Sequence, residues 1–179
     1  AFVGSQITSL ALPDGFESMD DTAFWYMPKL QRVDLGGAKA LTDSAFRYDK
    51  ALAEVNFRPD LNRLTDVGDY AFDGSALVSV SLPNSVTSIG KGAFAGNAAL
   101  RSVHLGSGLT SIGESAFVDA SNLASLSVAP TNSAFSVEDG VLYSKGDTGR
   151  ALVLSLPTNG ASEFTVPDGT VAIADTAFA

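Results

Sequence analysis

The chain has 179 residues, of which 45% are hydrophobic and 17% charged, and this supplies enough apolar material for one core of ordinary domain size. Its 20 acidic and 11 basic residues give a net charge of −9 without any run of Lys or Arg, so we expect no nucleic-acid partner. The apolar runs are too short to span a bilayer, so we expect no direct membrane insertion. The absence of cysteine excludes a disulfide framework, a thiolate nucleophile and a cysteine-ligated metal.

The dipeptide Ala-Phe recurs at a nearly constant spacing along the chain. Its phenylalanines stand at positions 2, 24, 46, 72, 94, 117 and 178, with gaps of 22, 22, 26, 22, 23 and 61 residues. One coil of this length cannot bury its own apolar face, whereas stacked coils bury the faces of their neighbours. The period therefore predicts a solenoid of about six repeats, organised as one domain over residues 1–179.

Each Ala-Phe is followed by a short segment in which apolar and polar residues alternate, as expected for a strand. In chain order these segments are 10–13, 30–35, 52–57, 77–82, 100–105 and 123–128. Identical segments in stacked coils predict a ladder of parallel strands with outward rows of side chains. One row is Ser9, Arg32, Glu54, Ser79, Ser102 and Ser125, and the other is Ala11, Asp34, Asn56, Ser81, His104 and Ser127.

A turn follows each strand, and then a segment such as VTSIGKGAF, which spans residues 86–94. Val86 and Ile89 are expected to point inward, and Phe94 to fill the space between coils. We expect one helical turn or a 3₁₀ piece at residues 91–95, because the segment is too short for an ordinary helix.

Two segments interrupt the period. Residues 57–63 (FRPDLNR) lengthen the repeat between Phe46 and Phe72, and a bulging loop is expected there. Residues 132–157 are expected to insert a hairpin with strands 137–144 and 151–156 and a turn at 145–150, because Gly146, Asp147 and Gly149 favour turns. The repeat then resumes up to Phe178.

The pattern LxxVxLPxxVTxIGxxAFxxxxxL resembles the BspA-like leucine-rich repeat family, also called the Treponema pallidum type. The best match is LVSVSLPNSVTSIGKGAFAGNAAL at residues 77–100, followed by LRSVHLGSGLTSIGESAFVDASNL at 100–123. The resemblance implies a leucine-rich repeat solenoid: a mainly β, right-handed coil with a parallel strand ladder and short helical turns on its convex side. It also implies an extracellular or cell-surface location and a role in bacterial adhesion or protein binding. Many repeats of the family carry a cysteine shortly after Ala-Phe, and this chain has none.

Both ends of the chain fall at the same point of the cycle without a polar cap, so we expect a piece of a longer surface protein.

The strand face is one candidate for partner binding. Charged and polar side chains gather on part of it, and the expected contact residues are Arg32, Asp34, Glu54, Asn56 and His104. The alternative is an ordinary solvated strand surface. His104 could act as a general base, but a single histidine without a nucleophile motif is better explained as a surface side chain.

An aromatic edge is the second candidate. Trp25 and Tyr26 replace the small Ala95 and Gly96 of the best repeat, and Tyr48 has the same offset as Tyr26. Exposed aromatic side chains anchor many interfaces, although these could instead pack against a neighbouring coil or another domain.

The sequence gives little support for catalysis, metal binding or phosphate binding. The acidic pairs 20–21 and 138–139 could serve a glycosidase or bind calcium, but they lack the spacing of a calcium loop, and Asp139-Gly140 favours a turn. No phosphate-binding glycine motif occurs, and no cofactor is expected. We therefore expect a non-catalytic extracellular module that binds a protein or glycoprotein, host extracellular matrix included. A passive spacer is the alternative, and a glycan-acting enzyme is the third possibility.

Overall fold

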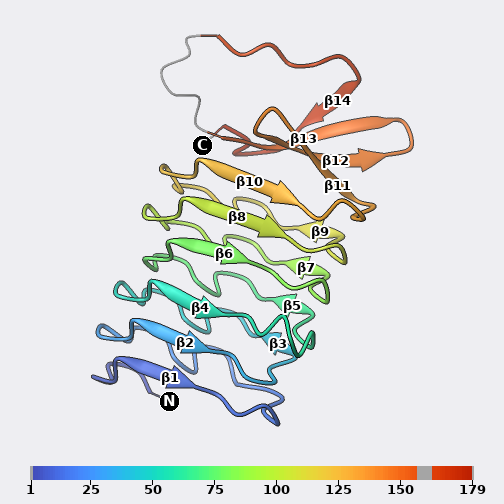
Figure 1. Cartoon of the computed structure of the whole chain (residues 1–179). Coiled ribbons are helices and arrows are strands. Elements are labelled where there is room, and N and C mark those ends of the chain that lie inside the picture. Colours follow the sequence, from blue (N-terminus) through green and yellow to red (C-terminus); the bar gives the residue numbers. More distant parts are fainter. Residues whose placement is uncertain (1, 157–162, 179) are drawn as a thin grey trace.

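Residues 2–156 and 163–178 are described by a computed structural model, in which successive coils stack along one axis (Figure 1). The molecule is a solenoid of about seven turns with parallel strands, and no helix occurs in these residues. This confirms the predicted leucine-rich repeat architecture.

The alternating segments form the strands of the first ladder, as predicted. The strands are β1 (Ser9–Ala11), β2 (Arg32–Asp34), β4 (Glu54–Asn56), β6 (Ser79–Ser81), β8 (Ser102–Leu105) and β10 (Ser125–Val128). They pair in parallel as two sheets, β1-β2-β4 and β6-β8-β10. Equivalent residues of successive coils stand side by side, so the predicted outward rows exist within each sheet. The break between the sheets falls at the repeat of 26 residues, because its extra residues follow β4.

A second ladder lies on another side of the coils and was not predicted. Its two-residue strands are β3 (Ala40–Leu41), β5 (Asp66–Val67), β7 (Ser88–Ile89) and β9 (Ser111–Ile112). All three pairings are parallel and in register. The inward residue of each strand, such as Ile89 at 1% exposure, closes the core on this side.

A stack of phenylalanine rings runs through the core. Successive rings from Phe2 to Phe117 lie 5.2–5.5 Å apart between centroids and nearly parallel. Small alanines such as Ala93, which is fully buried, precede each ring and leave room for the adjacent coil. The repeated Ala-Phe is thus the sequence signature of this ring stack.

The predicted helical turn at residues 91–95 is wrong. The N–H of Phe94 donates to Ala116 O in the next coil at 2.8 Å, as Gly92 and Gly96 donate to Glu114 O and Val118 O. Gly92 and Gly96 have φ of 57° and 66°, which aims alternate N–H groups out of their own coil. Ala93 N and Ala95 N keep turn bonds to Gly90 O and Gly92 O at 3.3 and 3.0 Å, so bonds between coils alternate with isolated turns and no helix forms there.

The inserted segment has three antiparallel strands where a two-stranded hairpin was expected. They are β11 (Phe135–Glu138), β12 (Val141–Gly146) and β13 (Gly149–Ser155). The predicted strand 137–144 is divided by Asp139 and Gly140, whose φ values of 49° and 78° suit a tight hairpin turn. The last residue of the predicted insertion, Pro157, lies outside the described residues.

The final coil does not extend the ring stack, contrary to the prediction. Its strand β14 (Thr170–Ile173) pairs with β13 and not with β9. Phe178 is 54% exposed and meets Phe164 edge-on at 5.1 Å. The inserted strands therefore separate this coil from the regular part of the solenoid.

Candidate functional site

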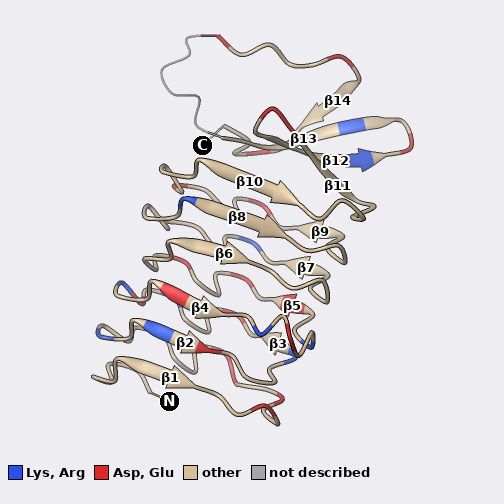
Figure 2. Cartoon of the chain, in the orientation of Figure 1, with Lys and Arg blue, Asp and Glu red and all other residues tan. Residues whose placement is uncertain are grey.

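The strand face brings four of the predicted contact residues together. Arg32 and Glu54 stand opposite each other on β2 and β4, and Arg32 Nη2 lies 2.8 Å from Glu54 Oε2. In the next row, Asn56 Nδ2 donates to Asp34 Oδ2 at 2.9 Å. The ribbon colours in Figure 2 mark charged residues on β2 and β4, whereas β6 and β10 carry none. These four residues, Arg32, Asp34, Glu54 and Asn56, are called the charged patch below.

Arg58 contacts the charged patch through Asp34, although sequence reasoning did not single it out. The expected loop at residues 57–63 exists, with Phe57 buried and φ of 49° at Arg58. Arg58 Nη1 lies 2.8 Å from Asp14 Oδ1 and 3.4 Å from Asp34 Oδ1, while Nη2 lies 2.9 Å from Asp60 Oδ2. The hydrogen bonds that Arg58 donates to Asp60 and then to Asp14 raise the pKa of Arg58. The inserted loop therefore fastens the first two coils to the third.

His104 lies apart from the charged patch, on β8 in the second sheet. Its Nδ1 is 3.0 Å from Ser127 Oγ on the neighbouring strand β10. Its neighbours in the outward row are Ser81 and Ser127, and neither is a carboxylate that could pair with it.

The aromatic edge, defined as Trp25, Tyr26 and Tyr48, is exposed. The three side chains are 36%, 49% and 37% accessible, and the rings of Trp25 and Tyr26 lie 5.9 Å apart. Tyr26 and Tyr48 occupy equivalent positions of adjacent coils, where their φ values of 53° and 61° match that of Gly96. The rings are thus partly exposed, and that of Tyr48 also lies against the neighbouring coil, since a Cβ at Gly74 would be only 2.7 Å from it.

Arg47 extends the aromatic edge toward the next coil. Its guanidinium carbon lies 4.6 Å from the ring centre of Tyr48 and 4.8 Å from that of Tyr70. Its Nε donates to Asp73 Oδ2 at 2.8 Å, and this pair is half-buried. Although burial opposes it, the hydrogen bond that Arg47 donates to Asp73 helps to raise the pKa of Arg47. Arg47 is therefore held between two rings, a role that its sequence position did not reveal.

Among the described residues, Asp49 is the one carboxyl side chain in the core, and it is fully buried. Its Oδ1 accepts the N–H of Met27 at 2.6 Å, and its Oδ2 has no hydrogen-bond partner among the described residues. Burial raises the pKa of Asp49 to about 7, and the bond from Met27 opposes this only in part.

Asn97 takes the equivalent place two coils later, since both residues follow their phenylalanine by three positions. Its Nδ2 donates to the carbonyls of Phe72, Phe94 and Ala95 at 2.8–3.2 Å. An amide therefore satisfies this position fully, whereas a carboxylate does not.

The acidic pairs do not build a metal site. Glu138 is engaged in an ion pair with Arg150, which also stacks on Tyr143. Across the residues that the structure describes, no group of three His, Cys, Asp or Glu side chains is placed to hold a metal ion. In the same residues no helix is long and apolar enough to cross a bilayer.

Comparison with known proteins gives both a family and structural neighbours. The model of the BspA type leucine rich repeat region family matches residues 1–66 and 65–144 with six copies. A leucine-rich repeat protein from Eubacterium ventriosum is similar, with 24% identity and a TM-score of 0.85, over 96% of this chain and 45% of that protein. The pneumococcal vaccine antigen PcpA is 20% identical with a TM-score of 0.70, over 98% of this chain and 53% of that one.

This chain thus spans about half the length of these two structures, whose likeness to it concerns the fold. No curated protein sequence matches it. The family model, however, covers far more than half of the chain and agrees with the stacked coils described above. The chain belongs to the BspA type leucine rich repeat region family.

Proposed function

We propose that the chain is a non-catalytic binding module of a bacterial cell-surface protein, and that it recognises a protein or glycoprotein outside the cell. Its family supports this proposal, and so does the description of one structural neighbour as a vaccine antigen. Host extracellular matrix is the first partner class to test, because the resemblance implies adhesion.

The aromatic edge is the observation that carries the proposal. Trp, Tyr and Arg are the residues most enriched among those that dominate binding energy at interfaces. Trp25 and Tyr26 present large rings on a rigid turn, and Arg47 lies one coil away beside Tyr48. The hydrogen bond from Tyr26 N to Arg47 O, at 3.0 Å, fixes the two turns relative to each other. A partner would therefore meet a surface that is already ordered.

The charged patch favours the second candidate, a passive spacer. Arg32 with Glu54, and Asp34 with Asn56 and Arg58, already satisfy one another across the coils. A partner would have to break these pairs, so we expect the patch to tune the rate of association more than the affinity.

Biolayer interferometry of the whole chain against extracellular matrix proteins and glycans, at low and high salt, tests the proposal. We expect saturable binding that Trp25→Ala with Tyr26→Ala weakens by at least about tenfold. The triple alanine variant of Arg32, Asp34 and Glu54 should change the salt dependence instead. A triple alanine variant of Ser79, Ser102 and Ser125, on the second sheet, is the matched control and should bind normally.

Two outcomes would go against the proposal. Absence of binding to every member of the panel at micromolar concentrations would support the spacer. Binding that survives the loss of both aromatic rings would place the contact elsewhere on the solenoid. Circular dichroism of each variant checks that the fold is kept.

A further inference from the structure

A hollow of about 360 Å³ lies where the regular solenoid meets the inserted strands. The turn after β9, at residues 113–118, forms one side, and the turn after β14, at residues 174–176, forms the other. Val153 and Leu154 of β13 close the back. The two turns touch at Ser115 and Thr176, whose hydroxyl oxygens are 3.4 Å apart. The volume lies in the lower range of ligand sites, which is roughly 300–1,000 Å³.

The hollow exists because β13 takes the place of one coil without supplying its turn. Ala174 N donates to Leu152 O at 2.8 Å, just as Gly113 N donates to Ile89 O at 2.7 Å in the regular part. Likewise, Ser155 N donates to Ala177 O at 2.7 Å, as Phe94 N donates to Ala116 O at 2.8 Å.

Leu152 and Ser155 therefore occupy the places of Ile89 and Phe94. The regular coil covers this distance in 94 − 89 = 5 residues, and β13 in 155 − 152 = 3. Two residues of outward turn are missing, and the space that they would fill is left open.

Beside the missing turn, three backbone N–H groups lack an acceptor in the part of the chain that the structure describes. In the preceding coil, the N–H groups of Gly92, Phe94 and Gly96 all donate to the next coil, at 2.8–3.0 Å. The equivalent groups of Ser115, Phe117 and Asp119 have no hydrogen-bond acceptor within residues 2–156 and 163–178. Ser115 and Asp119 keep the same backbone form, with φ of 56° and 61°, so these N–H groups point alike. Ser115 and Phe117 belong to the wall of the hollow.

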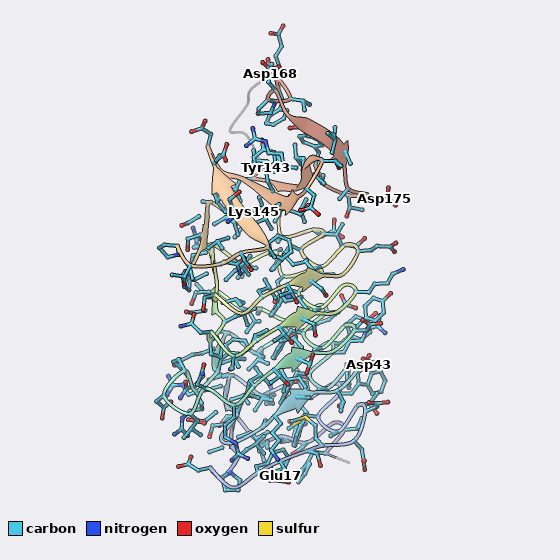
Figure 3. All side chains as sticks on the ribbon, turned by 90° about the vertical axis from the view of Figure 1, so that its right-hand side faces the viewer. Glu17, Asp43, Tyr143, Lys145, Asp168 and Asp175 are labelled. Carbon is cyan, nitrogen blue, oxygen red and sulfur yellow. The ribbon has the colours of Figure 1, made fainter. Side chains whose placement is uncertain are left out.

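The charges around the hollow narrow the class of ligand. Glu114 and Asp175 are its only charged lining residues in the described part of the chain, and both are exposed. Figure 3 shows Asp175 projecting from this edge of the molecule. Lys91 pairs with Glu114 at 3.2 Å from outside the hollow. Two carboxylates disfavour a free anion, although the aligned N–H groups alone would suit one.

We propose that the hollow binds a short, extended, basic peptide segment of a partner protein. Its main-chain carbonyls accept hydrogen bonds from Ser115 N and Phe117 N, as the missing turn would, and its Lys or Arg pairs with Glu114 and Asp175. This is the addition of an extended segment to an open backbone edge. The proposal rests on the proposed function in that the chain binds proteins, but its site is separate from the aromatic edge.

Titration of the ¹⁵N-labelled whole chain with capped tripeptides, followed by nuclear magnetic resonance, tests the proposal. The probes are acetyl-Ala-Lys-Ala-amide, acetyl-Ala-Glu-Ala-amide and acetyl-Ala-Ala-Ala-amide. We expect the lysine peptide to shift the amide signals of Ser115 and Phe117 saturably. The paired amides of Gly92 and Phe94 should not move. The glutamate peptide should bind most weakly.

Neutralising Glu114 and Asp175 separates their specific effect on binding from a general effect of net charge. Glu114→Gln with Asp175→Asn should weaken binding of the lysine peptide by about fivefold. The control, Asp147→Asn with Asp168→Asn, makes the same change in net charge on exposed turns and should leave binding unaltered. Trp25→Ala with Tyr26→Ala should also leave it unaltered, whatever that variant does to binding of the large partners.

Three outcomes would overturn the proposal. The first is that none of the peptides shifts Ser115 or Phe117. The second is that the glutamate peptide binds as well as the lysine peptide. The third is that both pairs of neutralising substitutions have equal effects. None of these decides whether the aromatic edge binds a macromolecule, which the interferometry measures separately.

Discussion

Replacing Asp49 by asparagine should stabilise the protein at neutral and alkaline pH. The carboxyl is fully buried, and its Oδ2 lacks a hydrogen-bond partner among the described residues. Asparagine would keep the acceptor for Met27 N and add a donor, as Asn97 Nδ2 does toward three carbonyls in its own coil position. The substitution thus replaces a charge that the core disfavours with an amide that the repeat already accommodates.

The size of the effect follows from the raised pKa. Burial raises the pKa of Asp49 from 3.8 to about 7, and each pH unit between them corresponds to about 1.4 kcal/mol, or about 4 kcal/mol in all. Between these two values the folded protein holds a proton that the unfolded chain has released. Stability therefore falls as pH rises from about 4 to about 7, and remains lowered above that.

Urea unfolding of the wild type and Asp49→Asn at several values between pH 4 and 8 measures this difference. Other carboxyls act in the opposite sense, since ion pairs lower the pKa of Glu17 and Asp60, but both proteins share them. The stability difference between the two proteins should be near zero at pH 4 and grow to a few kcal/mol at pH 8.

The reciprocal variant, Asn97→Asp, should be destabilised most at pH 8. A constant difference between wild type and Asp49→Asn across this pH range would refute the reasoning. So would an asparagine variant that is less stable than the wild type at pH 8.

Three further substitutions test the packing of the coils. Phe94→Ala removes a ring stacked between two others and should cost about 3–5 kcal/mol of unfolding free energy in urea; less than about 1 kcal/mol would contradict the ring stack. Gly37→Ala should lower the melting temperature far more than Gly169→Ala. A Cβ at Gly37 would strike Asp14 O, whereas at Gly169 it meets open space despite a φ of 81°. Similar decreases in melting temperature for the two variants would show that the coils move apart to accept the methyl group. Arg58→Lys should speed hydrogen exchange in residues 57–63, because lysine cannot form the forked contacts to Asp14 and Asp60, and unchanged exchange would mean that the loop holds itself.

Much of the fold follows from the sequence, because the repeat imposes the same contacts on every coil. Alternation placed the strands, and one Ala-Phe in each coil built the ring stack from Phe2 to Phe117. The helical turn was wrong because hydrogen bonds between coils compete with those inside a short turn. The signal was present in Gly92 and Gly96, which flank Phe94 symmetrically and admit positive φ.

The candidate sites were less accessible to sequence reasoning. The pairing of Arg32 with Glu54 follows from the strand register, which the repeat supplies. Arg58 reaches Asp14, 44 residues away, through a loop without periodicity, so no spacing rule indicates that contact. The burial of Asp49 was equally hidden, because the residue at its place varies among the other coils: it is Ser5, Met27, Ser75, Asn97 or Ala120.

The candidate sites coincide with departures from the repeat, for a physical reason. In a regular coil, the polar backbone groups and the apolar face contact the two neighbouring coils. Few of these groups therefore remain free to bind a ligand. Where the period changes, some side chains and backbone groups are not used in contacts between coils. The 26-residue repeat supplies Arg58, and a pair of tyrosines replaces glycine on one edge. The shortened β13 leaves the N–H groups of Ser115 and Phe117 without an acceptor among the residues that the structure describes. If binding is confined to such departures, then alanine variants of Ser79, Ser102 and Ser125 should bind normally in every assay. Variants at these three places should bind differently from the wild type.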